Sequence, residues 1–242
     1  MRILIITDIH SNLVALETVL DHAGKVDAVW CLGDVVGYGP SPNECISLIK
    51  KQPKLICLLG NHDAASINTL DIATFNPEAR RAVEWTQDTL TSESVAFLRE
   101  RPKLLIQGKV TLSHGSPRHP VFEYILDTRA ATENFTHFKT DFCFFGHTHL
   151  PVMFYMENND YMAKLTIPPV GETTELKPRV IINPGSVGQP RDRNPHAAYA
   201  VFDSEANTWD YHRVEYDFTT TQDHMRKHDL PERHIVRLES GW

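Results

Sequence analysis

The 242-residue chain has few cysteines, no excess of basic residues and no long apolar run, and each absence excludes a class of protein. Its 4 cysteines form no Cys-x-x-Cys pair, which argues against a structural zinc cluster or a thiol redox motif. The 24 Lys and Arg against 31 Asp and Glu leave a net charge of −7, which disfavours a nucleic-acid binder or a nuclease. The longest apolar run, Ala197–Phe202, is far shorter than the ~18 residues of a membrane span. No signal-peptide core precedes Asp8, so we expect a globular cytoplasmic protein without a membrane partner.

The first sixty residues alternate between short apolar strands and amphipathic helices. Strands are predicted over Arg2–Thr7, Asp27–Leu32 and Lys54–Leu59, and helices over Asn12–His22 and Pro42–Lys51. The strands are almost continuously apolar, which is typical of a buried parallel sheet covered by helices. The pattern therefore predicts an α/β fold.

Residues 64–102 are more polar, and two predicted helices, Pro77–Leu90 and Glu93–Arg101, indicate a helical insertion that forms one wall of a pocket. The following segments favour strands, with helices near Ala130–Phe138 and over Thr220–His228 before an irregular tail. The predicted strands are Leu104–Gln107, Lys109–Ser113, Asp141–Phe145, Val152–Met156, Tyr161–Ile167, Val180–Asn183, Ala198–Asp203 and Thr208–Glu215. A turn at Asn158-Asn159-Asp160 joins two of them as a hairpin. No repeat or linker divides the chain, so we expect one domain over residues 1–242, with two packed sheets between outer helices.

Five predicted strands end in side chains that can bind a metal ion. These side chains are Asp8, His10, Asp34, Asn61, His114, His147 and His149. The carboxyl ends of parallel strands are where open α/β sheets bind ligands, so we expect the groups to meet at one rim. The pairs Asp8/His10 and His147/His149 are two residues apart, which points both members to the same side of an extended backbone. A set of oxygen and nitrogen donors suits Mn, Fe, Zn or Ni.

Seven ligands are too many for one ion that must keep an open coordination position. Two divalent ions that share Asp34 would receive four protein ligands each, and such a pair is suited to hydrolysing phosphate esters through a hydroxide held between the ions. His62 follows Asn61 and is predicted to be the general acid that protonates the leaving oxygen, with Asp63 orienting its ring. As alternatives, His62 is a packed or metal-binding histidine and Asp63 caps the next helix.

These blocks resemble the signature of the calcineurin-like metallophosphoesterases. The matching motifs are Asp8-x-His10, Gly33-Asp34, Gly60-Asn61-His62-Asp63, His114 and Gly146-His147-x-His149. The resemblance implies a four-layer α/β/β/α sandwich of two mixed sheets and two bound ions, with Mn or Fe favoured over Zn or Ni. It assigns Asp8, His10, Asp34 and His149 to one ion, Asp34, Asn61, His114 and His147 to the other, and proton donation to His62. The segments Gly37-Tyr38-Gly39-Pro40 and 183–188 are similar to those of small prokaryotic YfcE-like or diadenosine-tetraphosphatase-like members.

One departure bears on the substrate. Protein Ser/Thr phosphatases and symmetrical diadenosine tetraphosphatases carry Asp-Arg-Gly shortly after Gly-Asp, whereas this chain reads Val35-Val36-Gly37-Tyr38-Gly39. Arg118 and Arg191 are the predicted replacements for the missing phosphate-binding arginine. We expect a small phosphorylated substrate, a phosphodiester or dinucleoside polyphosphate. The alternatives are a phosphoprotein Ser/Thr phosphatase and a non-catalytic interaction scaffold of the same fold. The sequence does not predict an oligomeric state.

Overall fold

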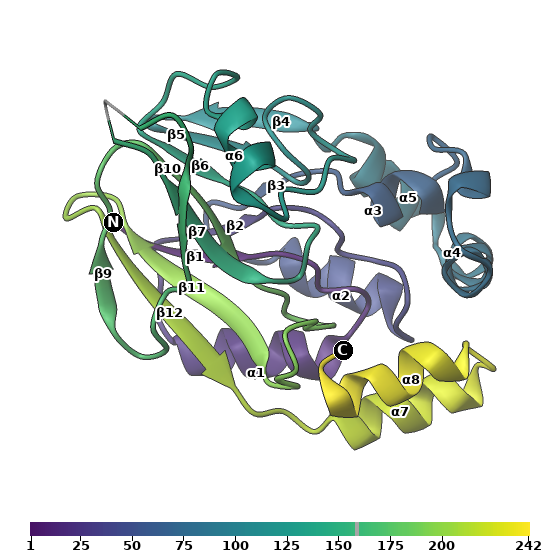
Figure 1. Ribbon diagram of the computed structural model, residues 1–242. Helices are drawn as coiled ribbons and strands as arrows, with labels where there is room; N and C mark the ends of the chain where they lie inside the picture. The colour runs from purple at the N-terminus through teal and green to yellow at the C-terminus, as the bar shows by residue number, and fades with distance from the viewer. Residues whose placement is uncertain (158–159) are drawn as a thin grey trace.

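The computed structural model describes residues 1–157 and 160–242, whose strands form two mixed six-stranded sheets packed face to face (Figure 1). The first sheet has the order β3 (Ile56–Cys57), β2 (Ala28–Cys31), β1 (Arg2–Ile6), β11 (Ala197–Asp203), β12 (Thr208–Val214) and β9 (Thr173–Glu175). The second has the order β4 (Leu104–Gln107), β5 (Val110–Ser113), β6 (Phe142–Phe144), β10 (Val180–Pro184), β7 (Pro151–Tyr155) and β8 (Lys164–Thr166). Strands β1, β2 and β3 run parallel, as do β5, β6 and β10.

Helices cover both outer faces, which confirms the predicted four-layer sandwich. Helices α1 (Leu13–Ala23) and α2 (Pro42–Ile49) lie on the first sheet, and α6 (Thr128–Asn134) lies on the second (Figure 1). Alternation along β1 explains the layers, because Leu4 and Ile6 pack toward the helices while Ile3 and Ile5 pack between the sheets. Full burial of each such side chain contributes about 1.5–3 kcal/mol to the free energy of unfolding.

The predicted insertion is helical. It contains the second half of α3 (Asn61–Ser66), the 3₁₀ turn η1 (Ile72–Thr74), α4 (Pro77–Thr89) and α5 (Ser92–Arg99), grouped at one end of the sandwich (Figure 1). Helix α3 was not predicted, because its short sequence is polar and begins within the ligand block. Strand β3 is correspondingly shorter than the predicted Lys54–Leu59.

The prediction of an irregular tail is wrong. After α7 (Phe218–Lys227) the chain turns back and forms α8 (Glu232–Ser240), which packs against α7 through Ile235 and Leu238. The missed signals are Pro231 at the helix start and apolar residues three apart. Strand β9 was also missed because it is a three-residue, largely exposed edge strand.

The predicted hairpin is present, since β7 pairs with β8 in an antiparallel register. Asn158 and Asn159 of its predicted turn lie outside the described residues.

Cys31, Cys45, Cys57 and Cys143 are buried and unpaired, as the apolar runs around three of them indicated. Within the described residues, no helix is long and apolar enough to cross a membrane.

Candidate metal centre

The seven predicted ligands converge at the carboxyl ends of five strands. Asp8 and His10 follow β1, Asp34 follows β2, Asn61 opens α3 after β3, His114 follows β5, and His147 and His149 follow β6. All seven are buried. Among the described residues, histidine and carboxylate atoms form three groups at this rim that could each hold a metal ion, Asp8/His10/His149, Asp34/His114/His147 and His10/Asp34/His62, the last of which adds His62 to the predicted set. The Asn61 Oδ1 atom lies 3.1 Å from His114 Nε2 and so adjoins the second group.

In each of the two carboxylates, Asp8 and Asp34, one oxygen accepts hydrogen bonds and the other, called bare below, has no hydrogen-bond partner among the described residues. Asp8 Oδ2 accepts hydrogen bonds from Thr7 Oγ1 and from the backbone N–H of His147, while Asp34 Oδ1 accepts the backbone N–H of His62 at 2.9 Å. Asp8 Oδ1 and Asp34 Oδ2 are buried without a hydrogen-bond partner among the described residues. A bare buried carboxylate oxygen is costly unless a cation binds it, so these atoms fit bound metal ions.

The Asp34 oxygen without a hydrogen-bond partner among the described residues, Oδ2, lies between the His10 side of the centre and the His114 side. Its Oδ2 atom is 3.3 Å from His114 Nε2 and 3.6 Å from His10 Nε2. Asp8 Oδ1 lies 3.2 Å from His149 Nε2, and His149 Nε2 lies 3.1 Å from His10 Nε2. This geometry makes Asp34 the residue best placed to contact two ions at once.

Backbone carbonyls orient the four candidate histidine ligands. His10, His114 and His149 direct Nδ1 to the carbonyls of Val36, Leu32 and Gln189 at 3.2, 3.0 and 2.6 Å, and His147 directs Nε2 to the Phe122 carbonyl at 3.2 Å. Because a carbonyl only accepts, the contacting nitrogen must donate, and in the neutral ring the other nitrogen keeps a lone pair for a metal ion. Such outer contacts fix the ring orientation of metal-binding histidines.

The backbone at this rim is strained in the left-handed region. Positive φ angles occur at Asp8 (53°), His10 (49°), Asp34 (52°), His147 (65°) and His149 (59°). Non-glycine residues rarely adopt this conformation, and it tends to persist where function requires it. Gly60 permits a further close approach, because a Cβ atom there would lie 2.0 Å from Asp34 Oδ1.

Charges at the centre are coupled through Asp34. Burial opposes ionisation of Asp34, but the neighbouring His114 ring holds the pKa of this carboxyl well below its usual range. Burial also acts against protonation of His114, yet Asp34 raises the pKa of His114 to about 9. A proton on His114 thus neutralises Asp34 in the metal-free protein, and a divalent ion would replace this proton.

His62 lies against the centre, and among the described residues no hydrogen bond joins the Asp63 carboxylate to the His62 ring. The centroid of the His62 ring lies 4.9 Å from that of the His10 ring and 4.3 Å from that of the Tyr38 ring. The Nδ1 atom of His62 is buried and has no hydrogen-bond partner among the described residues. Asp63 accepts the backbone N–H groups of Val36 and Gly60, each at 3.0 Å. The contacts of Asp63 therefore correspond to the helix-cap alternative and not to the predicted ring-orienting role.

The two predicted phosphate-binding arginines differ in their surroundings. Arg118 forms ion pairs with Glu123 and Glu133, which neutralise its charge. Arg191 instead donates to the neutral Gln189 Oε1 at 2.9 Å and lies 3.5 Å from Tyr38 Oη. The segment 183–188 supports the turn that carries His147 and His149. Asn183 Nδ2 donates to the Gly146 carbonyl at 2.7 Å and to Thr148 Oγ1 at 3.0 Å.

A cavity of about 260 Å³ opens onto the centre. It is lined by Tyr38, Asn61, His62, Thr74, Phe75, Asn76, Ala79, Phe122, Tyr124 and His147. The Tyr124 ring stacks on the His147 ring with centroids 3.8 Å apart, and Phe122 and Tyr124 are each 47% exposed. Phe75 and Ala79 belong to the insertion, which therefore forms one wall of the cavity, as expected.

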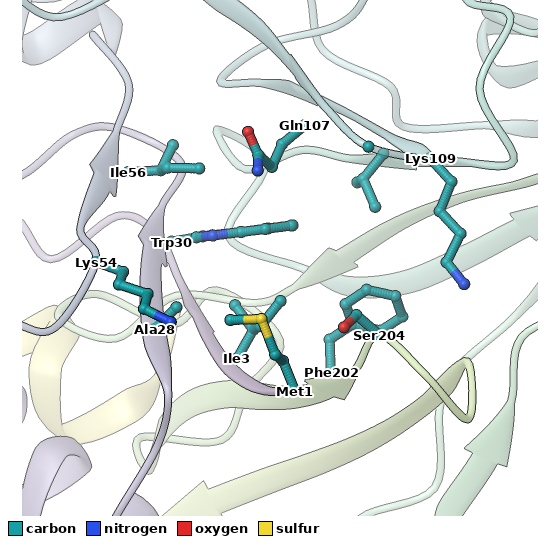
Figure 2. A pocket seen from close by; sticks show the side chains of 12 residues that line it. Met1, Ile3, Ala28, Trp30, Lys54, Ile56, Gln107, Lys109, Phe202 and Ser204 are labelled. Atoms are coloured by element: carbon teal, nitrogen blue, oxygen red, sulfur yellow. The ribbon is translucent and has the colours of Figure 1, made fainter.

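A second cavity, of about 410 Å³, lies at the opposite end of the sheets, where β1 begins (Figure 2). Met1, Ile3, Trp30 and Phe202 line it, with Lys54 and Lys109 among the other lining residues. None of its twelve described lining residues is a histidine, cysteine or carboxylate, so this cavity offers no metal ligands of those types.

Sequence reasoning missed several supporting groups. Tyr38 packs against both His10 and His62, and the sequence marked it only as part of the segment Gly37-Tyr38-Gly39-Pro40. The carbonyls of Gln189 and Phe122 come from distant segments and carry no side-chain signal. Arg237 of α8 donates to Gln189 Oε1 at 3.4 Å, but the segment containing it had been interpreted as an irregular tail.

Comparison with known proteins agrees with the fold. Residues 1–207 match the calcineurin-like phosphoesterase superfamily domain. A metallophosphoesterase crystal structure from Sphaerobacter thermophilus is 46% identical, with a TM-score of 0.91 over 100% of this chain and 99% of that chain. An uncharacterized protein of Methanocaldococcus jannaschii is 36% identical over 99% of this chain and 98% of its own length. A symmetrical bis(5'-nucleosyl)-tetraphosphatase of Aromatoleum aromaticum is 27% identical over 47% of this chain and 44% of its own length. The chain therefore belongs to the calcineurin-like phosphoesterase superfamily and is a phosphoester hydrolase.

Proposed function

We propose that residues 1–242 act as a single two-metal phosphoesterase domain that hydrolyses a phosphodiester or a dinucleoside polyphosphate. The observation that carries this proposal is the pair of bare carboxylate oxygens, Asp8 Oδ1 and Asp34 Oδ2, buried among imidazole nitrogens. A cytoplasmic location is supported by the four unpaired cysteines.

The residues at the rim fit two divalent ions. Asp8, His10, Asp34 and His149 would hold one, and Asp34, Asn61, His114 and His147 would hold the other. Ions bound there would neutralise the charge that develops on the phosphoryl oxygens and activate water. The mixed oxygen and nitrogen donors favour Mn or Fe, with Zn or Ni as alternatives.

The chain's own groups would complete the reaction. His62, which adjoins His10 and Asp34, would protonate the leaving oxygen, and Asp63 would position His62 indirectly by capping α3. Arg191 carries a positive charge beside the centre without a carboxylate partner in the described chain, whereas Arg118 would first have to release two carboxylates to bind phosphate.

The aromatic cavity supports a nucleotide substrate. Phe75, Phe122 and Tyr124 offer ring faces and edges next to His62, and stacking on such rings contributes about 1–3 kcal/mol per base. The similarity to a symmetrical bis(5'-nucleosyl)-tetraphosphatase also supports this class.

Substrate comparison tests the proposal. Chelator-treated protein should be inactive, and Mn should restore hydrolysis of bis(p-nitrophenyl) phosphate and diadenosine tetraphosphate. The kcat/KM values for these two substrates should exceed that for p-nitrophenyl phosphate or a phosphoserine peptide by about tenfold or more. Preference for the peptide would instead indicate a protein phosphatase, and inactivity on every substrate with two ions bound would indicate a non-catalytic scaffold.

A further inference from the structure

Two arginines from different parts of the chain meet at one neutral oxygen. Arg191 lies in the loop after β10, and Arg237 lies on α8. Arg191 Nη2 donates to Gln189 Oε1 at 2.9 Å, and Arg237 Nη1 donates to the same atom at 3.4 Å. Gln189 is buried, and neither arginine forms an ion pair within the described ranges 1–157 and 160–242.

This arrangement leaves two positive charges close together with no ion-pair partner among the described residues. Arg191 Nε is also buried and lacks a hydrogen-bond partner among the described residues. Burial and the neighbouring Arg191 lower the pKa of Arg237, as expected where like charges converge. An anion bound between the two would relieve their repulsion, and the planar guanidinium group matches phosphate oxygens.

The arginine pair adjoins the candidate metal centre. The Arg191 backbone N–H donates to the His149 carbonyl at 3.4 Å, and its guanidinium carbon lies 5.8 Å from the Tyr38 ring centroid. The Tyr38 ring in turn packs 4.3 Å from the His62 ring. The pair therefore lies one side chain away from the group proposed to protonate the leaving oxygen.

We propose that Arg191 and Arg237 bind a second phosphate group of the substrate, next to the one that is hydrolysed. This inference rests on the proposed function and narrows it, since it favours nucleotides with two or more linked phosphates over simple phosphodiesters. Arg191 lies within the matched residues 1–207, whereas Arg237 lies on α8, beyond them, so the proposed site joins the matched region to the C-terminal helices.

Arg237→Gln tests the proposal, with Arg233→Gln as the matched control. Arg233 lies on the same helix, is exposed and faces Glu78 instead of Gln189. The kcat/KM ratio of diadenosine tetraphosphate to bis(p-nitrophenyl) phosphate should fall about tenfold or more in Arg237→Gln. The ratio should not change in Arg233→Gln. An unchanged ratio in Arg237→Gln, or an equal fall in both variants, would overturn the proposal.

A binding measurement separates this proposal from the proposed reaction. Calorimetry on chelator-treated protein should show tripolyphosphate binding that weakens about tenfold in Arg237→Gln and weakens less in Arg237→Lys, which preserves the charge but not the planar fork. Equal affinity in the wild type and in Arg237→Gln would refute the site even if the enzyme were active. If wild-type protein hydrolysed neither substrate but bound tripolyphosphate through Arg237, the proposed function would fail while the phosphate site would stand. If Arg237→Gln does not fold, Arg237→Lys is compared with Arg191→Gln instead. A loss of tripolyphosphate affinity in folded Arg237→Lys that is as large as the loss in Arg191→Gln would refute a charge-based site.

Discussion

Asp34→Asn is expected to lower metal affinity by more than about 100-fold, because loss of an outer contact alone costs about 10–100-fold. The amide oxygen would keep the hydrogen bond from the His62 backbone N–H, which places the NH₂ group where Oδ2 now faces His10 and His114. An amide NH₂ donates and cannot bind a cation. Phosphoester hydrolysis should therefore be lost together with the metal.

Metal analysis and kinetics on the same preparation check this result. Asp21→Asn makes the same chemical change on an exposed position of α1 and should retain both metal and activity. An Asp34→Asn variant that keeps two ions and full turnover would rule out Asp34 as the shared ligand.

His62→Ala is expected to reduce kcat by about 10²–10⁴ while metal content is retained, if His62 is the general acid. Burial lowers the pKa of His62 to about 4, so the ring is neutral at pH 7 in the free, metal-free protein. An anionic substrate beside the ring would raise this pKa and so allow proton donation. The rate for a poor leaving group should then fall as pH rises through the substrate-bound pKa.

The leaving group separates acid catalysis from simple packing. The His62→Ala defect should be large for an alkyl phosphodiester and small for bis(p-nitrophenyl) phosphate, because p-nitrophenolate departs without protonation. His224→Ala, which removes an exposed imidazole on α7, should match the wild type on both substrates. Equal defects of His62→Ala on the two substrates would exclude the general-acid role.

The sequence predicted the convergence of the ligands for a simple physical reason. A parallel strand that is apolar along its length must be buried, and its carboxyl end must lie beside those of its neighbours. The positions of Asp8, Asp34 and His147 follow from this rule together with the glycines near each strand end. The layer structure follows in the same way from continuous apolar strands alternating with one-sided helices.

Other features depend on tertiary contacts that the local sequence does not encode. The carbonyls of Phe122 and Gln189 orient His147 and His149, yet any residue type can supply a carbonyl. The sequence left two roles open for Asp63, and the Val36 N–H group that its carboxylate accepts comes from a distant segment with no side-chain signal. Arg237 reaches Gln189 because α8 folds back on α7, and the buried face of α8 is too short to give a clear helical pattern in the sequence.

Anomalous diffraction from manganese-soaked crystals tests the central claim most directly. The account predicts two manganese peaks per chain, about 3.5–4 Å apart, with Asp34 between them. One peak should contact Asp8 and His149, and the other should contact His114 and His147. A single peak, or manganese bound only away from these side chains, would contradict it.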